Sequence, residues 1–220
     1  MNWLSSVRAS LLVCIAVLVS ACGGGADSDS PKAPAADAAV PPAASSAGNA
    51  TVSGMAPAAK SGVPAIVILK SVQPQDVPPQ SAPPVMDQIQ LEFTPTILFA
   101  RPGQPAEFRN SDDQLHNIRV LEESTKEPAF NIALPTGGAY KHTFEKEGFY
   151  DVGCDIHPGM SAVVVAANTP FMSIAAQDGQ FVFSNVPPGD YTLTVYAGAK
   201  KYERVVTVQA GTVDVGAVAG

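Results

Sequence analysis

The stretch Gly153-Cys154-Asp155-Ile156-His157-Pro158-Gly159-Met160 places a thiol, an imidazole and a thioether close together, with the spacing Cys-x-x-His-x-x-Met. Soft sulfur and imidazole ligands favour copper, and two His and one Cys with a weak axial Met are typical of electron-transfer copper sites. The chain has only three histidines, and His116 is the natural candidate for the second imidazole. The sequence therefore predicts that His116, Cys154, His157 and Met160 bind one type 1 copper ion.

Zinc is the alternative metal for this ligand set. It also accepts cysteine and histidine ligands with similar spacing. Methionine is a poor zinc ligand, so Met160 favours copper over zinc.

The three cysteines of the chain have different expected roles. Cys14 lies in an apolar run near the start of the chain, and Cys22 lies at the expected processing point. Cys154 is then the one thiol left in the folded part, so no internal disulfide is expected. A solitary thiol in an exported protein is either a liability or a ligand, and the neighbouring histidine favours the ligand.

The N-terminal residues have the pattern of an export signal. Residues 1–21 combine Arg8, an apolar stretch from Leu11 to Val19 and small residues, and this stretch is too short to span a bilayer. The sequence Val19-Ser20-Ala21-Cys22 resembles the lipobox of bacterial lipoproteins, which implies lipidation of Cys22. Ordinary cleavage near Ala21 is the alternative. Residues 22–50 are mostly Gly, Ala, Ser, Pro and Asp, a composition that predicts a disordered linker.

The remaining residues have the pattern of strands joined by turns. Ile89-Gln90-Leu91-Glu92-Phe93 alternates with a period of two, and Ser161 to Ala166 is an apolar run expected to form a buried strand. The chain contains 20 Pro and 18 Gly, and no window has a helical period of useful length. We therefore predict an all-β fold.

The ligand spacing fits such a fold. A strand that ends at Cys154 can turn sharply at Pro158-Gly159, which folds His157 and Met160 over one point. His116 can reach that point from a neighbouring strand. The side chain of Asn117 is then expected to hydrogen-bond across to the Cys154 loop and hold it in place.

Two groups of motifs resemble the plastocyanin/azurin family of cupredoxins. The first is Phe108-x-Asn110-x-Asp112 with Leu115-His116-Asn117-Ile118; the second is Glu147-Gly148-Phe149-Tyr150 with Cys154-x-x-His157-x-x-Met160. The short ligand loop is most similar to that of amicyanin, and the likeness covers residues 85–168. It implies a Greek-key β-sandwich, one mononuclear copper ion, and electron transfer through the exposed imidazole edge of His157.

One position departs from the family pattern. Asp155 follows the cysteine ligand directly, where the resemblance implies a neutral residue. The carboxylate could lower the redox potential, or it could mark a drift toward a role in copper binding alone.

A second, smaller β-sandwich is expected from the C-terminal residues. The turns Asp178-Gly179 and Pro187-Pro188-Gly189 separate alternating strands, and residues 172–215 resemble the carboxypeptidase regulatory-like, or prealbumin-like, domain. The opening hairpin of that family matches residues 51–70. We therefore expect residues 51–70 and 171–220 to form one sandwich into which the copper domain, residues 85–168, is inserted. Simple tandem order is the alternative.

The composition excludes some classes of function. The net charge is −7 without a basic block, so nucleic acid is not an expected partner. No Ser/His/Asp set can be assembled without a copper ligand, and His142 is expected to be an exposed strand residue, so no enzyme activity is expected.

These features together predict an extracytoplasmic electron carrier. We expect it to be anchored to a membrane, in the periplasm or at the cell surface, through lipid at Cys22. Its expected partner is a redox protein that the sequence does not identify. The alternatives are copper handling without electron transfer, meaning storage, delivery or sensing, and a surface scaffold with a vestigial metal site.

Overall fold

The computed structural model describes residues 48–58 and 64–218. The strands are β1 (Ala50–Met55), β2 (Ile66–Ser71), β3 (Val85–Ile89), β4 (Glu92–Thr94), β5 (Ile97–Ala100), β6 (Pro105–Asn110), β7 (His116–Glu122), β8 (Pro128–Leu134), β9 (Ala139–Thr143), β10 (Gly148–Gly153), β11 (Ser161–Ala166), β12 (Phe171–Ile174), β13 (Gln180–Val186), β14 (Gly189–Ala197), β15 (Lys200–Val208) and β16 (Gly211–Ala217). The described residues contain no helix, which confirms the all-β prediction.

The predictions for the N-terminus concern other parts of the chain. The export signal of residues 1–21, the lipidation site Cys22 and nearly all of the linker predicted over residues 22–50 lie outside the described residues. Within the described part, there is no helix with the length and apolarity that a membrane span requires.

Residues 85–166 form two sheets that enclose one apolar core. One sheet has the strand order β5-β11-β10-β7-β8, and the other has the order β4-β3-β6-β9. Most neighbouring strands are antiparallel, but β5 pairs with β11 and β3 pairs with β6 in parallel. Alternate residues of both sheets point inward, and Phe108, Ile118, Val120 and Val164 are among the fully buried members of the core.

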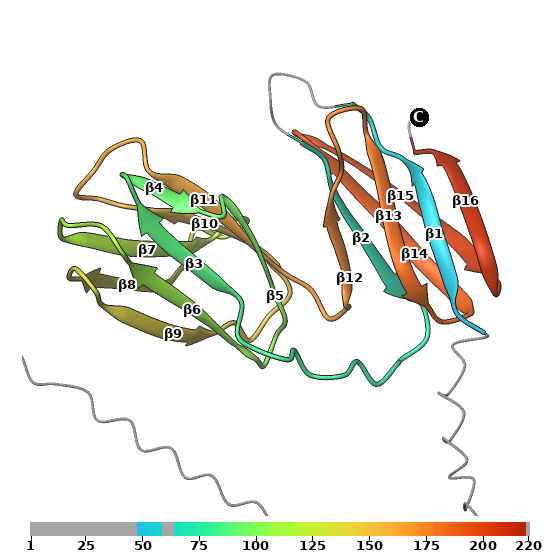
Figure 1. The fold of residues 1–220 in the computed structure, drawn as a ribbon, viewed down its shortest axis with the longest axis horizontal. Coiled ribbons are helices and arrows are strands. Elements are labelled where there is room, and N and C mark those ends of the chain that lie inside the picture. Colours follow the sequence, from blue (N-terminus) through green and yellow to red (C-terminus); the bar gives the residue numbers. More distant parts are fainter. Residues whose placement is uncertain (1–47, 59–63, 219–220) are drawn as a thin grey trace, which may run out of the picture. The chain divides into compact units, whose positions relative to one another are not determined.

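The remaining strands form two further sheets, with the orders β13-β1-β16 and β12-β2-β14-β15. Figure 1 shows β1, from the start of the described chain, between β13 and β16 from its end. Likewise, β2 lies between β12 and β14. Strands β1 and β2 therefore share their sheets and their core with strands β12 to β16.

Strand β2 is buried on both faces. Val67 and Leu69 point into the core shared with β1 and β14. The alternate residues Ile66 and Ile68 pack in a separate cluster with Val165 of β11. This double burial explains why the sequence of β2 is a continuous apolar run instead of an alternating one.

Each pair of sheets contains a tyrosine whose hydroxyl forms a hydrogen bond with the backbone of the preceding turn. The Tyr150 hydroxyl donates to the carbonyl of Lys146 at 2.9 Å, and the Tyr191 hydroxyl donates to the carbonyl of Pro187, also at 2.9 Å. Both rings are buried. A buried tyrosine hydroxyl bonded to backbone a few residues upstream is the tyrosine corner of Greek-key sandwiches.

The strand predicted over Ile89–Phe93 is wrong in one respect. The chain turns back at Gln90 and Leu91, whose φ angles are 55° and 62°, so β3 and β4 form a hairpin. Positive φ at both central residues is what a two-residue type I′ turn requires. The Asp112 carboxylate accepts hydrogen bonds from both backbone N–H groups, at 2.6 Å and 2.9 Å, which stabilises a conformation that side-chain-bearing residues rarely adopt.

Candidate metal centre

The candidate metal ligands come from two neighbouring strands of the same sheet. His116 is the first residue of β7, and Cys154 directly follows the last residue of β10. The two strands are antiparallel neighbours, with Arg119 opposite Gly153. The start of β7 and the end of β10 therefore lie at the same end of the sandwich. The loop from Cys154 to Met160 lies at that end, and the chain then continues as β11, antiparallel to β10.

Three donor atoms converge at this end of the sandwich. The Sγ of Cys154 lies 3.8 Å from the Nδ1 of His116 and 3.9 Å from the Nδ1 of His157. The two Nδ1 atoms are 2.9 Å apart. Within the described residues, this is the group of His, Cys, Asp and Glu side chains that could hold a metal ion.

These separations can be compared with those that one ion imposes. Metal–nitrogen bonds of about 2.0–2.1 Å and a metal–sulfur bond of about 2.3 Å, spread at about 120°, place the sulfur roughly 3.8 Å from each nitrogen and the nitrogens roughly 3.5 Å apart. The observed sulfur–nitrogen distances agree with this geometry, and the two imidazoles are somewhat closer together. The donor set therefore fits a single ion bonded to three side chains.

The site is buried on the side of the sandwich core. His116 is fully buried, and Cys154 and Met160 are also buried and belong to the apolar core cluster. His157 is half-buried. Most of the site is therefore closed to water, and the His157 ring provides its contact with the surface.

Two backbone hydrogen bonds close the loop. The Met160 N–H donates to the His157 carbonyl, and the Cys154 N–H donates to the Met160 carbonyl, both at 3.4 Å. Gly159, between these contacts, has a φ of 102°, a conformation that favours glycine over other residues. The backbone thereby brings Met160 back to the core beside Cys154.

Asp112 fixes the ring of His116. Its Oδ2 lies 2.9 Å from the Nε2 of His116, so Nε2 carries the proton and Nδ1 keeps its lone pair for a metal. The N–H of Leu91, followed by that of Gln90 and the His116 ring, holds the pKa of Asp112 below its ordinary value. The carboxylate is therefore charged at neutral pH and orients the imidazole.

Asn117 connects β7 to the ligand loop, as the sequence predicts. Its Oδ1 accepts the N–H of Asp155 at 2.7 Å and lies 3.3 Å from the Cys154 sulfur. Its Nδ2 donates to the Asp155 carboxylate at 2.9 Å and to Asn131 at 2.9 Å. The side chain is buried, and it spans the gap between the strand and the loop.

Asp155, which directly follows Cys154, is charged and bonded on both oxygens. Arg119 donates to Oδ1 at 2.7 Å, and Asn131 donates to Oδ2 at 3.2 Å, besides the bond from Asn117. These bonds, first that of Arg119 and then those of Asn117 and Asn131, hold the pKa of Asp155 below its ordinary value.

The structure brings the donor atoms of His116, Cys154 and His157 together, with Asn117 bonded to the loop that starts at Cys154 and Met160 at the end of that loop, whereas Cys22 lies outside the described residues. The sequence patterns did not indicate Arg119 and Asn131 as partners of the loop, nor the bond between Asp112 and the His116 ring. For Asp112, the signal available was its position four residues before His116. His142 is half-buried and not exposed as predicted, because its ring packs 4.5 Å from that of Phe130.

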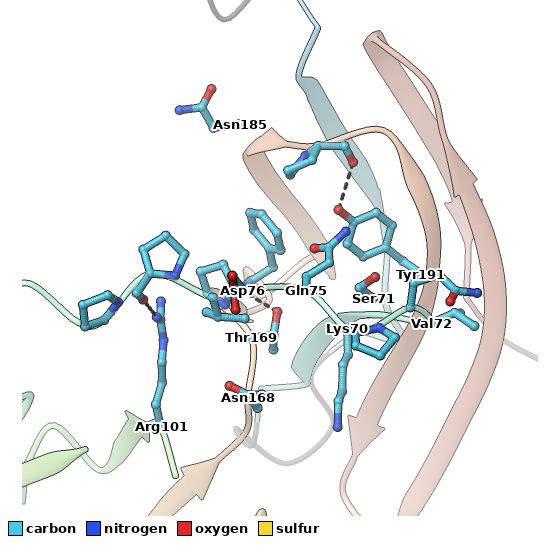
Figure 2. Close-up of a pocket in the computed structure, with 18 residues that line it drawn as sticks. Lys70, Ser71, Val72, Gln75, Asp76, Arg101, Asn168, Thr169, Asn185 and Tyr191 are labelled. Atoms are coloured by element: carbon cyan, nitrogen blue, oxygen red, sulfur yellow. Dashed lines mark hydrogen bonds between the residues drawn. The ribbon is translucent and has the colours of Figure 1, made fainter. Parts of the chain in front are cut away.

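A cavity of about 590 Å³ lies away from this site, beside β2, β14 and the segment that follows β2. Figure 2 shows Lys70, Arg101, Asn168 and Tyr191 among the residues around it. Both basic side chains are engaged, since Lys70 pairs with Glu147 at 2.7 Å and Arg101 donates to the Pro78 carbonyl. The cavity thus offers no free cationic group, and none of its lining residues belongs to the donor set.

Comparisons with known proteins give partial likenesses. The profile of a family described as polysaccharide lyase family 4, domain II, matches residues 160–214. No curated protein matches this sequence.

Among solved structures, a purple cupredoxin from Nitrosopumilus maritimus is 24% identical, with 38% of this chain and 99% of that chain covered and a TM-score of 0.35. A reduced tryptophan-to-tyrosine variant of amicyanin is 22% identical. The match covers 46% of this chain and 98% of that chain, with a TM-score of 0.36. A copper-containing nitrite reductase from Thermus scotoductus is 27% identical. The match covers 45% of this chain and 25% of that chain, with a TM-score of 0.37. This chain therefore spans a quarter of the nitrite reductase.

Proposed function

We propose that this protein binds one type 1 copper ion and transfers single electrons, as the cupredoxins do. The observation that carries the proposal is the convergence of the Cys154 sulfur and the Nδ1 atoms of His116 and His157, at 2.9–3.9 Å from one another. Met160 is also buried, its backbone carbonyl accepts the Cys154 N–H at 3.4 Å, and its thioether would be the weak fourth ligand. This donor set of two imidazoles, one thiolate and one thioether favours copper over zinc.

The chain contributes rigidity to electron transfer. An ion in this site supplies the one-electron change between Cu(II) and Cu(I). His116 is held by β7 and by Asp112, and Cys154 is held by the end of β10 and by Asn117. Ligands anchored in this way move little when the charge of the ion changes. His157 is the half-buried ligand, so its imidazole edge is the place where we propose that a redox partner makes contact.

The metal-binding groups favour an electron carrier over an enzyme. A copper oxidase or nitrite reductase would need further ligands, and the remaining histidine, His142, packs against the rings of Phe130 and Phe144. Within the described residues, no second metal-binding group accompanies the first.

The experiment that tests the proposal is titration of the purified chain with Cu(II), followed by voltammetry. We expect one copper per chain, an intense thiolate-to-copper absorption band in the visible region, and a reversible one-electron wave. The Cys154→Ser variant should lose the band, because the band requires the thiolate. A colourless copper complex would contradict a type 1 site. A coloured complex without a reversible wave would contradict electron transfer and favour copper handling.

We also propose a domain arrangement in which the copper domain of residues 85–168 is inserted into the smaller sandwich. The proposal is supported by the strand pairs that join β1 to β13 and β16, and β2 to β12 and β14. Strands β1 and β2 thus pair with strands that follow residues 85–168 in the chain.

We further propose that the protein is an extracytoplasmic lipoprotein, anchored through Cys22. The support is the sequence Val19-Ser20-Ala21-Cys22 after an apolar run. Two or more acyl chains bind a membrane stably where one is marginal. The Cys22→Ser variant, expressed in a bacterial host, should move from the membrane fraction to the aqueous fraction; an unchanged membrane fraction would contradict the lipid anchor.

A further inference from the structure

The carboxylate of Asp155 is the centre of a closed set of hydrogen bonds beside the ligand loop. Its Oδ2 accepts from the Nδ2 of Asn117 at 2.9 Å and from the Nδ2 of Asn131 at 3.2 Å. The Nδ2 of Asn117 also donates to the Oδ1 of Asn131 at 2.9 Å. The three side chains therefore form a ring in which each donor faces an acceptor.

The sheet places these partners before the loop begins. Asn117 and Arg119 lie on the same face of β7, two residues apart, and Arg119 is opposite Asn131 of β8. Arg119 is also opposite Gly153 of β10, and a Cβ at Gly153 would lie 3.0 Å from its guanidinium. The absence of a side chain at Gly153 thus lets Arg119 extend across β10 and donate to the Oδ1 of Asp155 at 2.7 Å.

The charge of Asp155 determines which way the carboxamide of Asn117 points. In the observed orientation, Oδ1 accepts the backbone N–H of residue 155 at 2.7 Å, and Nδ2 faces the carboxylate. A rotation by 180° would bring the amide oxygen against the carboxylate and the amide protons against the backbone N–H. Both new contacts would be repulsive, so the carboxylate permits one orientation. The ring of hydrogen bonds fixes Asn131 in the same way.

We infer that Asp155 is a positioning residue of the copper site, which acts through Asn117 to fix the backbone between Cys154 and His157. The inference rests on the proposed function for the copper site itself. The path is continuous: Arg119 holds Asp155, Asp155 orients Asn117, and Asn117 bonds the loop N–H next to the thiol. Residues that orient metal ligands typically contribute about 10–100-fold to metal affinity.

The test uses three variants of the full chain: Asp155→Asn, Asp155→Ala and Arg119→Gln. The last leaves the loop sequence unchanged, so it remains informative if substitutions in the loop disturb folding. The matched control is Asp151→Asn. Asp151 lies on β10 and pairs with Lys126 at 2.6 Å. Its loss therefore removes the same charge and a similar surface ion pair without touching Asn117.

The first measurement is made by NMR on the metal-free chain. In the wild-type chain, the backbone N–H of residue 155 should exchange slowly, and the Asn117 side-chain NH₂ should have a distinct, protected signal. After correction for intrinsic rates, we expect exchange to be about tenfold faster in the Asp155 variants, which corresponds to the loss of about one ordinary hydrogen bond. Arg119→Gln should change in the same direction by less, and Asp151→Asn should match the wild type.

The second measurement is made on the Cu(II)-loaded chains. We expect the copper electron paramagnetic resonance spectrum to change, and copper affinity to fall by about tenfold, in the Asp155 variants and not in Asp151→Asn. If the wild type fails to form a type 1 site, the proposed function fails and the exchange rates alone decide the role of Asp155. If the Asp155 variants match Asp151→Asn in exchange and in spectrum, the inference is wrong.

Discussion

At the scale of single residues, the donor atoms depend on polar side chains that fix their direction. His116 has no contact with solvent, and its ring could rotate unless the second nitrogen is bonded. Asp112 provides that bond, and it also accepts the N–H groups of Gln90 and Leu91. One carboxylate therefore couples the β3–β4 turn to a metal ligand.

This coupling predicts the effect of Asp112→Asn. An amide can present its NH₂ to the His116 ring and cannot accept both turn N–H groups as strongly, so the ring should lose its fixed orientation. We expect copper affinity to fall by about tenfold, measured by competition with a chelator of known affinity. The control is Asp113→Asn, which changes the exposed neighbouring residue. Equal affinities for the two variants would contradict the role of Asp112.

The ligands and their supporting residues differ in how well the sequence predicts them. Cys154, His157 and Met160 could be proposed as ligands from the sequence, because their spacing in one short loop carries the signal. Asn117 was predictable because it adjoins His116. Arg119 and Asn131 were not, since their bonds to Asp155 join residues 36 and 24 positions apart in the chain. Strand register determines these contacts, and the register cannot be inferred from a single sequence.

At the scale of elements, the pattern of apolar residues predicted strands well where no distant residue stabilises a turn. The run Ser161 to Ala166 is β11, with the predicted bounds. Alternation failed at Gln90 and Leu91, where a residue distant in sequence stabilises a turn. It also gave no signal for β8, which begins with a proline and has mixed exposure along its length. An edge strand of this kind is defined by its pairing with β7 more than by its own residues.

The strand β9 carries a histidine in an aromatic environment. The ring of His142 lies 4.5 Å from that of Phe130 in β8 and 4.8 Å from that of Phe144. Burial lowers the pKa of His142 below its ordinary value, against a smaller opposing influence of Glu145. The neutral imidazole is therefore favoured in the folded chain, where it contributes as an aromatic group.

This environment predicts a pH dependence of stability. Because the folded pKa of His142 is below the unfolded value of about 6.5, its contribution is fully present above that pH. The contribution is lost as the pH falls from there toward the folded pKa. Urea unfolding of the wild type and of His142→Gln, from about pH 7.5 to pH 5, should show a steeper loss of stability in the wild type. Parallel curves would show that His142 does not titrate differently in the two states.

At the scale of the whole molecule, the described residues form two pairs of sheets, and each pair encloses its own apolar core. The composition and strand patterns were sufficient to predict an all-β fold, whereas the second sandwich was predicted from the resemblance of residues 172–215 to a known domain family. The parallel pairing of β1 with β16 joins residues from opposite ends of the described chain. A local pattern cannot report such a pairing, because parallel partners need no turn between them.

The candidate metal site lies at one end of one sandwich, and its donor atoms depend on the sheet for their position. β7 and β10 would lie side by side through their backbone pairing alone. The ligand loop therefore begins and ends on elements that the core already holds, and the ion would add a bond between them. If copper binds the folded chain and not the unfolded chain, the free energy of unfolding should rise as the copper concentration rises.

The central claim is that a single copper ion lies among the Cys154 sulfur and the Nδ1 atoms of His116 and His157. The most direct measurement is a crystal structure of the copper-loaded protein, with anomalous scattering recorded on both sides of the copper absorption edge. We expect one copper peak per chain, bonded to these three atoms, with Met160 as the next nearest donor. A copper peak at any other place, or an ion bonded through the Nε2 of His116 with its contact to Asp112 broken, would contradict the claim.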